Sequence, residues 1–206
     1  MSPLAAATQR WLSGHARAAL ARALGLRGAL AESGPPPDDA ALREPARVFV
    51  SWHVQGRLRG CIGTLAANDP LADAVARYAV ESGQHDPRMV PMTIDELVCA
   101  SVEISVLGAP ASLLEPGGAP VTGVGAIATC LRPHEHGVVL RLGARRAVFL
   151  PVVWESLPEP AAFLAALCRK AGIDPHGEGA FVQAELFEAQ RWDAPPLPSA
   201  GPIGPA

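Results

Sequence analysis

The chain has 206 residues, of which 49% are hydrophobic and 18% charged; this suits one ordinary domain, or one domain with two lobes, and excludes global disorder. Its 20 glycines and 21 prolines predict many turns and exclude a long coiled coil. A net charge of -3 provides no general basic surface, so non-specific binding to nucleic acid is not expected. No apolar run approaches the roughly 20 residues that a bilayer span needs, so no membrane partner is expected.

The four cysteines show no paired spacing. They are Cys61, Cys99, Cys130 and Cys168, without a CxxC pair, so neither a zinc knuckle nor a redox pair is predicted. Residues 1–32 contain several arginines and no acid before Glu32, which is also typical of transit peptides. Because no apolar signal region precedes a cleavage site, we interpret them as an amphipathic first helix. Reduced thiols and a cytoplasmic location are therefore expected.

The first half of the chain is predicted to contain helices, a β-hairpin and a central strand. Apolar residues at helical spacing indicate the helices, and β-branched and aromatic residues indicate the strands. The hairpin turns at Gln55-Gly56, and the capping box Thr93-Ile94-Asp95-Glu96 begins a short helix. The expected elements are helix 8–24, strands 47–54 and 57–62, helix 70–83, the short helix after Thr93, and strand 99–107.

The second half continues the mixture without strict β-α-β alternation. The stretch 121–131 fits either a helix or a strand. The other expected elements are a loop at 109–120, a hairpin of strands 136–142 and 146–150, a helix at 159–171 and a strand at 181–188. This order predicts an α+β fold with a mainly antiparallel sheet flanked by helices. A single domain with two unequal lobes is expected over 1–192, followed by a proline-rich flexible tail at 193–206.

The most unusual segment is LRGCIG at 58–63. Its cysteine, Cys61, lies between Gly60 and Gly63 at the end of a strand, although glycine weakens strands. Glycine does allow close approach of a ligand or of another backbone segment. Exposed N–H groups from Gly60 to Gly63 would suit an anion or a developing oxyanion, which makes both glycines candidate substrate-binding residues.

Arginines precede this cysteine at two-residue intervals. In a regular strand Arg57, Arg59 and Cys61 share one face, and nearby guanidinium groups favour a thiolate. The alternative is structural. A two-residue turn places Trp52 opposite Arg59 and Val50 opposite Cys61, so that the thiol packs as a small apolar group and Arg59 stacks on Trp52.

Several strings together make the chain resemble the AMMECR domain family, whose hallmark is LRGCIG. The other strings, in the family's order, are DPR at 86–88, VEISVL at 102–107, HGV at 136–138, FLP at 149–151 and FL..LCRKAG at 163–172. The resemblance implies one compact α/β domain with unequal lobes, from the first helix to about residue 192. The chain departs from the pattern at Val152-Val153, where relatives have Gln-Val, and at Met89, where they have an aromatic residue.

Within the family the chain is most similar to the bacterial single-domain members of AmmeMemoRadiSam systems. The resemblance implies two companions, a Memo-like protein and a radical SAM enzyme. It raises Cys61 to a candidate for covalent or substrate-binding chemistry, with Arg59 as anion clamp or thiolate stabiliser. Asp86 and Arg88 are candidate substrate-binding residues, with a mutual salt bridge as the alternative. His136 is a candidate base, with a solvated loop histidine as the alternative.

Three classes of function remain open. The first is an enzyme or enzyme subunit in which Cys61 attacks an electrophilic carbon of a small metabolite, a nucleobase or a peptide. The second is a non-catalytic binding module that uses the LRGCIG turn as a docking surface for the Memo-like partner. The third is a nucleic-acid adaptor with a local arginine patch. Cys168 is predicted to lie in the core, and neither a metal ion nor a cofactor is expected.

Overall fold

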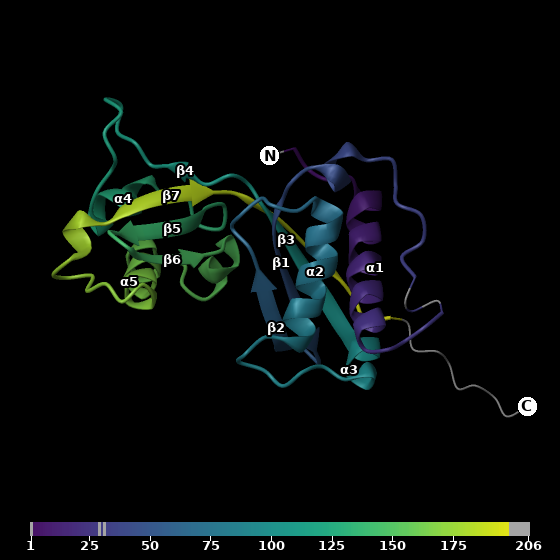
Figure 1. Ribbon diagram of the computed structural model, residues 1–206. Helices are drawn as coiled ribbons and strands as arrows, with labels where there is room; N and C mark the ends of the chain where they lie inside the picture. The colour runs from purple at the N-terminus through teal and green to yellow at the C-terminus, as the bar shows by residue number, and fades with distance from the viewer. Residues whose placement is uncertain (1, 29, 31, 198–206) are drawn as a thin grey trace, which may run out of the picture. The chain divides into compact units, whose positions relative to one another are not determined.

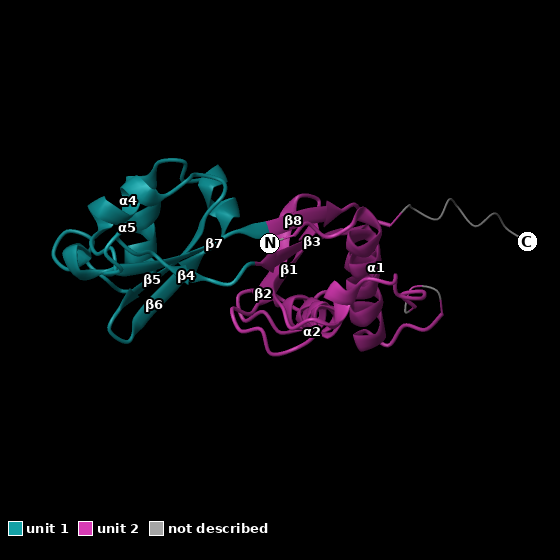
Figure 2. Ribbon diagram, turned by 90° about the horizontal axis from the view of Figure 1, so that it is seen from above, with its two compact units in different colours: residues 1, 108–189 teal, residues 2–107, 190–206 magenta. Residues whose placement is uncertain are grey.

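The computed structural model describes residues 2–28, 30 and 32–197, and it divides the chain into two compact units (Figure 2). Unit 1 is the continuous segment Gly108–Ala189, and unit 2 comprises Ser2–Leu107 with the residues from Gln190 onward. Each unit has its own four-stranded sheet and its own hydrophobic core. The predicted α+β class with two unequal parts is therefore confirmed.

Unit 2 holds a four-stranded sheet in the order β2-β1-β3-β8, with the helices α1 and α2 against one of its faces (Figure 1). The two central strands form because their residues are rich in Val, Ile and aromatic side chains. The elements are α1 (Ala6–Ala23), η2 (Ala40–Arg43), β1 (Arg47–Val54), β2 (Arg57–Gly63), α2 (Leu71–Gln84), α3 (Ile94–Cys99), β3 (Ala100–Leu107) and β8 (Ala189–Ala194).

The two faces of this sheet differ in chemistry. On β1, Val48, Val50 and Trp52 are fully buried in the core that α1 and α2 complete. The intervening residues Ser51 and His53 lie on the opposite face, because successive side chains of a strand alternate. We call this opposite face the second face of unit 2.

The β1–β2 hairpin turns where the sequence predicted, with positive φ at Gln55 and Gly56, but its register differs from the prediction. Trp52 pairs with Gly60 instead of Arg59, because a β-bulge shifts the register between Trp52 and His53. Without the bulge, Arg59 would share the buried face with Trp52, and burial of an unpaired charge is costly. The bulge therefore moves Arg59 out of the apolar face.

The same shift changes the neighbour of the cysteine. Cys61 pairs with Ser51, so the predicted packing of Cys61 beside Val50 is wrong. Ser51 lies on the second face, and Cys61 lies there with it.

Unit 1 packs helices α4 and α5 with a sheet of order β4-β7-β5-β6. Its core is centred on Trp154, which stacks on Phe163 at 3.9 Å between ring centroids. The elements are β4 (Ala111–Ser112), α4 (Val124–Cys130), β5 (Gly137–Leu142), β6 (Arg145–Phe149), η3 (Pro151–Glu155), α5 (Pro160–Lys170), η4 (Gly179–Phe181) and β7 (Gln183–Phe187).

Three of the strands and α-helices were not predicted as such. The predicted loop 109–120 contains the short strand β4, the ambiguous stretch 121–131 contains the helix α4, and the strand β8 had no counterpart in the prediction. Strand β8 extends two residues past the expected boundary at 192, and the Arg17 guanidinium donates hydrogen bonds to the carbonyl oxygens of Ala194 and Pro195. The remainder of the predicted tail, 198–206, lies outside the described residues. None of the described helices has the length and apolarity to cross a bilayer.

Candidate functional site

Cys61 lies on the edge strand of the unit 2 sheet, and its side chain is on the second face. It pairs with Ser51 on β1, and Ser51 pairs with Glu103 on β3. Three polar residues thus form a row across three adjacent strands. The Cys61 residue is partly exposed.

The two glycines beside Cys61 are required by backbone packing. A Cβ on Gly60 would overlap the carbonyl oxygen of Ser82 near the end of α2, and a Cβ on Gly63 would overlap the backbone of Val48 and the ring of Phe49. Of the two reasons for glycine considered from the sequence, close approach of another backbone segment therefore explains both positions.

The DPR turn that follows α2 holds the backbone of Cys61. The Asp86 Oδ2 atom accepts a hydrogen bond from the Cys61 N–H at 2.9 Å, and Arg88 Nη2 donates to the Cys61 carbonyl oxygen at 2.9 Å. Arg88 also binds the Asp86 carboxylate with Nε at 2.9 Å and Nη2 at 2.7 Å. The mutual salt bridge considered from the sequence is present, and both of its members also bind Cys61.

The charges at this turn are fixed by the same contacts. The hydrogen bonds from Arg88 hold the pKa of the Asp86 carboxyl far below its usual range, against the opposing effect of burial. The pKa of Arg88 is raised, first by its hydrogen bonds to Asp86 and to a smaller extent by interaction with the Cys61 side chain. The Asp86 side chain is 2% exposed and that of Arg88 is 60% exposed. An Arg88–Asp86 ion pair therefore lies at Cys61, and its guanidinium is open to solvent.

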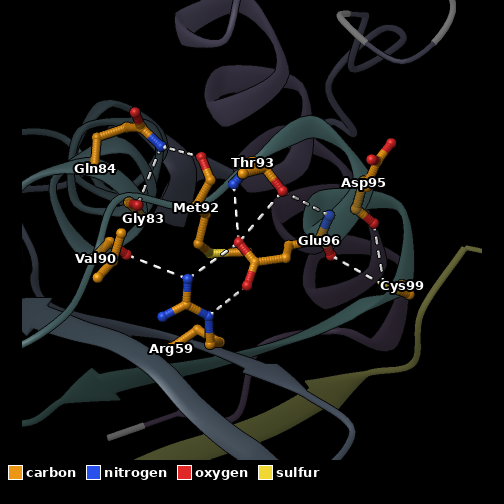
Figure 3. A network of polar contacts seen from close by, with 9 residues as sticks. All are labelled: Arg59, Gly83, Gln84, Val90, Met92, Thr93, Asp95, Glu96 and Cys99. Atoms are coloured by element: carbon orange, nitrogen blue, oxygen red, sulfur yellow. Dashed lines mark hydrogen bonds and ion pairs between the residues drawn. The ribbon is translucent and has the colours of Figure 1, made fainter.

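Arg59 binds a different partner from those predicted (Figure 3). Its Nε and Nη2 atoms donate to the two Glu96 carboxylate oxygens at 2.7 and 3.0 Å, and Nη2 also donates to the Val90 carbonyl oxygen. Glu96 belongs to the predicted capping box, which is confirmed: the Thr93 side chain accepts from the Glu96 N–H, and Glu96 accepts from the Thr93 N–H. Arg59 thus links β2 to the start of α3.

The alternative role considered for Arg59, stacking on Trp52, is wrong. Trp52 is fully buried, and its Nε1 donates to the Ala79 carbonyl oxygen at 3.0 Å. The cation over its ring is Arg17, at 5.9 Å from the ring centroid.

His136 belongs to unit 1, whereas the other candidate site residues belong to unit 2. It is 8% exposed, so the prediction of a solvated loop histidine is wrong. Its Nδ1 atom accepts from the Arg132 N–H, and its carbonyl oxygen accepts from Trp154 Nε1 at 2.7 Å. Burial and the charge of Arg132 lower the pKa of His136, which therefore stays neutral near pH 7. These contacts give His136 a structural position in its own unit.

A sequence model of the AMMECR1 family matches residues 14–192, which include unit 1 and most of unit 2. The chain belongs to the AMMECR1 family. A relative from Methanothermobacter thermautotrophicus is 33% identical over 146 residues, which cover 68% of this chain and 71% of that protein. A relative from Clostridium acetobutylicum is also 33% identical, over 130 residues that cover 63% of this chain but 25% of that longer protein. The crystal structure of the uncharacterised protein PH0010 from Pyrococcus horikoshii is similar with a TM-score of 0.76, at 26% identity over 92% of this chain and 93% of that one.

The remaining cysteines of this AMMECR1-family chain divide by exposure. Cys168 is fully buried in the core of unit 1, as predicted, and burial raises the pKa of its thiol. Cys99 and Cys130 are exposed on short helices. Within the described ranges, no group of three or more His, Cys, Asp or Glu side chains could hold a metal ion.

Sequence reasoning missed three polar residues on the second face. Ser51 and Ser105 are 6% and 4% exposed, and Glu103 pairs with Ser51 and precedes Ser105 by two positions on β3. For β3 the sequence contained a signal, because polar side chains recur at every second position of 101–105 and alternate with apolar ones. That pattern was interpreted only as a strand, since the polar side of a sheet is commonly solvated.

Proposed function

We propose that this AMMECR1-family protein acts through Cys61 as a nucleophile or covalent carrier for an electrophilic carbon of a small polar substrate. The observation that carries the proposal is the Arg88 guanidinium, which donates to the Cys61 carbonyl oxygen at 2.9 Å and is held there by a nearly buried Asp86 carboxylate. A fixed cation attracts the negative charge of a thiolate, which is the reactive form of cysteine. A reducing compartment such as the cytoplasm would keep Cys61 reduced.

The proposed step is a nucleophilic displacement at carbon. The Cys61 sulfur forms a bond to the electrophilic carbon, its proton leaves to solvent, and a leaving group departs with the electron pair of the broken bond. The Arg88 side chain is 60% exposed. Its solvent-facing N–H groups can therefore donate hydrogen bonds to a carbonyl or carboxylate oxygen next to that carbon.

The resemblance to bacterial AmmeMemoRadiSam systems supports the setting in which this step would occur. We place the protein in a set with a Memo-like protein and a radical SAM enzyme, which together would act on a small metabolite, a nucleobase or a peptide. The Clostridium relative supports a cooperating role, since there the matching region is one quarter of a longer chain.

The test is the site-resolved rate of alkylation by iodoacetamide, measured by mass spectrometry at neutral pH. Cys61 should react faster than the buried Cys168, and faster than the exposed Cys99 and Cys130. Arg88→Ala should slow Cys61 about three- to tenfold, as expected for the loss of a charge-assisted contact. The matched control is Arg77→Ala, which removes an exposed arginine paired with Asp69.

A second candidate function is the binding module, and exposed apolar side chains on β2, on α3 and in the segment between α2 and α3 favour it. These are Leu58, Val90, Ile94 and Val98, which are 37 to 73% exposed. Exposed apolar side chains contribute the buried area of a protein contact. If Cys61 is alkylated no faster than Cys99, and Arg88→Ala does not change its rate, the nucleophile proposal is wrong. The binding module is then the favoured function.

A further inference from the structure

The second face of unit 2 contains two hydroxyl groups without protein partners. Ser51 and Ser105 are each more than nine-tenths buried, and no hydrogen bond joins either hydroxyl to another described residue. Neither oxygen is among the buried side-chain atoms of the described residues that lack a partner, so both hydroxyls still reach solvent. A ligand that lies on this face can therefore hydrogen-bond to hydroxyls that no protein group occupies.

The register places one of these hydroxyls directly beside the cysteine. The Cys61 N–H and C=O groups are directed to Asp86 and Arg88, so the Cys61–Ser51 pair does not exchange backbone hydrogen bonds. In antiparallel sheets, side chains of such pairs approach each other most closely, with Cβ atoms about 4.5 Å apart. A molecule attached to the Cys61 sulfur therefore reaches the Ser51 hydroxyl within a few bonds.

The next position along the row carries a carboxylate. Glu103 pairs with Ser51 and is held by Arg191, with Nε 3.8 Å from Oε2; its side chain is 17% exposed. Strands are spaced about 4.8 Å apart, so Glu103 lies about 10 Å from Cys61 at the Cα positions. The neighbouring Arg191 makes the row unsuited to a cationic group, whereas a neutral donor can share the carboxylate oxygens.

We infer that the row Cys61–Ser51–Glu103 is the substrate-binding surface and that it selects a neutral polar molecule. This molecule carries a carbonyl group beside the electrophilic carbon, and a hydroxyl or amide donor several bonds from that carbon. Arg88 binds the carbonyl oxygen at one end, and Ser51 and Glu103 bind the donor group at the other. This inference rests on the proposed role of Cys61, and it adds the substrate class.

The test uses two alkylating probes of the same length, N-(2-hydroxyethyl)iodoacetamide and N-propyliodoacetamide. In both reactions the Cys61 sulfur forms a bond to the CH₂ carbon, iodide leaves, and the thiol proton goes to solvent. The measured quantity is the hydroxyethyl-to-propyl ratio of rates at Cys61, divided by the same ratio for free glutathione. In the wild-type protein we expect a preference of about three- to tenfold, the range of one or two net hydrogen bonds.

The variants Ser51→Ala and Glu103→Gln should each bring the normalised ratio closer to one. Ser101→Ala is the matched control. It removes a hydroxyl from the same strand as Glu103, and that hydroxyl already donates to the His53 carbonyl oxygen. Circular dichroism checks that each variant is folded.

The outcomes separate the two claims. If Cys61 reacts rapidly but the normalised ratio is near one, the inference is wrong while the proposed function stands. The inference is also wrong if Ser101→Ala lowers the normalised ratio as much as Ser51→Ala and Glu103→Gln do. The preference for the hydroxyethyl probe would then not depend on the row Cys61–Ser51–Glu103. If Cys61 reacts with neither probe faster than Cys99 does, the proposed function itself fails.

Discussion

Asp86 and Arg88 act together on the one residue of β2 that carries the thiol. An edge strand presents unpaired N–H and C=O groups, which a neighbouring strand would normally satisfy. Here the Asp86 carboxylate accepts from the Cys61 N–H, and the Arg88 guanidinium donates to the Cys61 carbonyl oxygen. The pair therefore replaces a neighbouring strand at this position and leaves the Cys61 side chain on the second face.

Asp86→Asn tests the strength of this arrangement through its pH dependence. The variant should lower the free energy of unfolding by about 1–3 kcal/mol at pH 7, because hydrogen bonds to a charged group are lost. The pKa of Asp86 is depressed in the folded protein and is near 4 in the unfolded chain. The carboxylate's contribution is therefore complete above about pH 5 and is lost as the pH falls below about 4.

The difference in unfolding free energy between wild type and Asp86→Asn should accordingly be constant from pH 8 to 5 and shrink below about pH 4. Urea denaturation at a series of pH values measures it. Asp69→Asn provides the control, since Asp69 pairs with Arg77 at an exposed site and should cost little. A difference that does not change down to pH 2.5 would contradict this account.

At the scale of single elements, local patterns predicted most of the fold. The strands 47–54 and 99–107 and the helix after Thr93 are present within one residue of their expected bounds, because alternation, helical spacing and a capping box are local signals. The bulge that fixes the neighbour of Cys61 was not predictable in this way. It arises because Gly60 must face the Ser82 carbonyl of α2, which is a contact across the fold.

The strand β8 was missed for a related reason. Its six residues give no strong strand signal, and their partners are far away in the sequence. Trp192 Nε1 donates to the Ser13 hydroxyl, and the Gln190 side chain binds the backbone of Ser2 and Leu4.

The candidate site, like the fold, was predicted from the sequence only in part. Sequence motifs indicated Cys61 and the Asp86–Arg88 pair. Ser51 and Glu103 join them only through strand pairing, which the sequence did not show.

Gly60→Ala tests the close approach of β2 to α2. The added methyl group would overlap a backbone carbonyl, which cannot move without shifting the helix or the strand. We expect a loss of about 3 kcal/mol or more in the free energy of unfolding, comparable to severe overpacking. Gly14→Ala is the matched control in the same unit, since nothing lies within 4 Å of its Cβ position and it is inside α1, where alanine should stabilise by up to about 1 kcal/mol. Equal midpoints for both variants in urea would show that the packing is looser than described.

At the scale of the whole molecule, the chain forms two cores that share no buried residue. The core of unit 2 contains residues from α1, α2 and the sheet of β1, and the core of unit 1 contains residues from α4, α5 and the sheet of β5. Unit 1 is inserted between β3 and β8, which are neighbours in the unit 2 sheet. The two ends of the insertion meet, since the Gly108 N–H donates to the Glu188 carbonyl oxygen at 2.9 Å.

This topology predicts that unit 2 can fold without the insertion and keep the chemistry of Cys61. Replacing residues 109–187 by Asn-Gly would join Gly108 to Glu188 through a tight turn of the kind that connects adjacent strands. The shortened chain retains the complete core of unit 2 and every contact of Asp86 and Arg88, so it should unfold cooperatively in urea and alkylate Cys61 at the rate of the full chain. A chain that folds but alkylates Cys61 slowly would show that unit 1 supplies part of the reactive environment, and would return His136 to the set of candidate catalytic residues. A chain that does not fold would show that the core of unit 2 depends on unit 1 in spite of their separate packing.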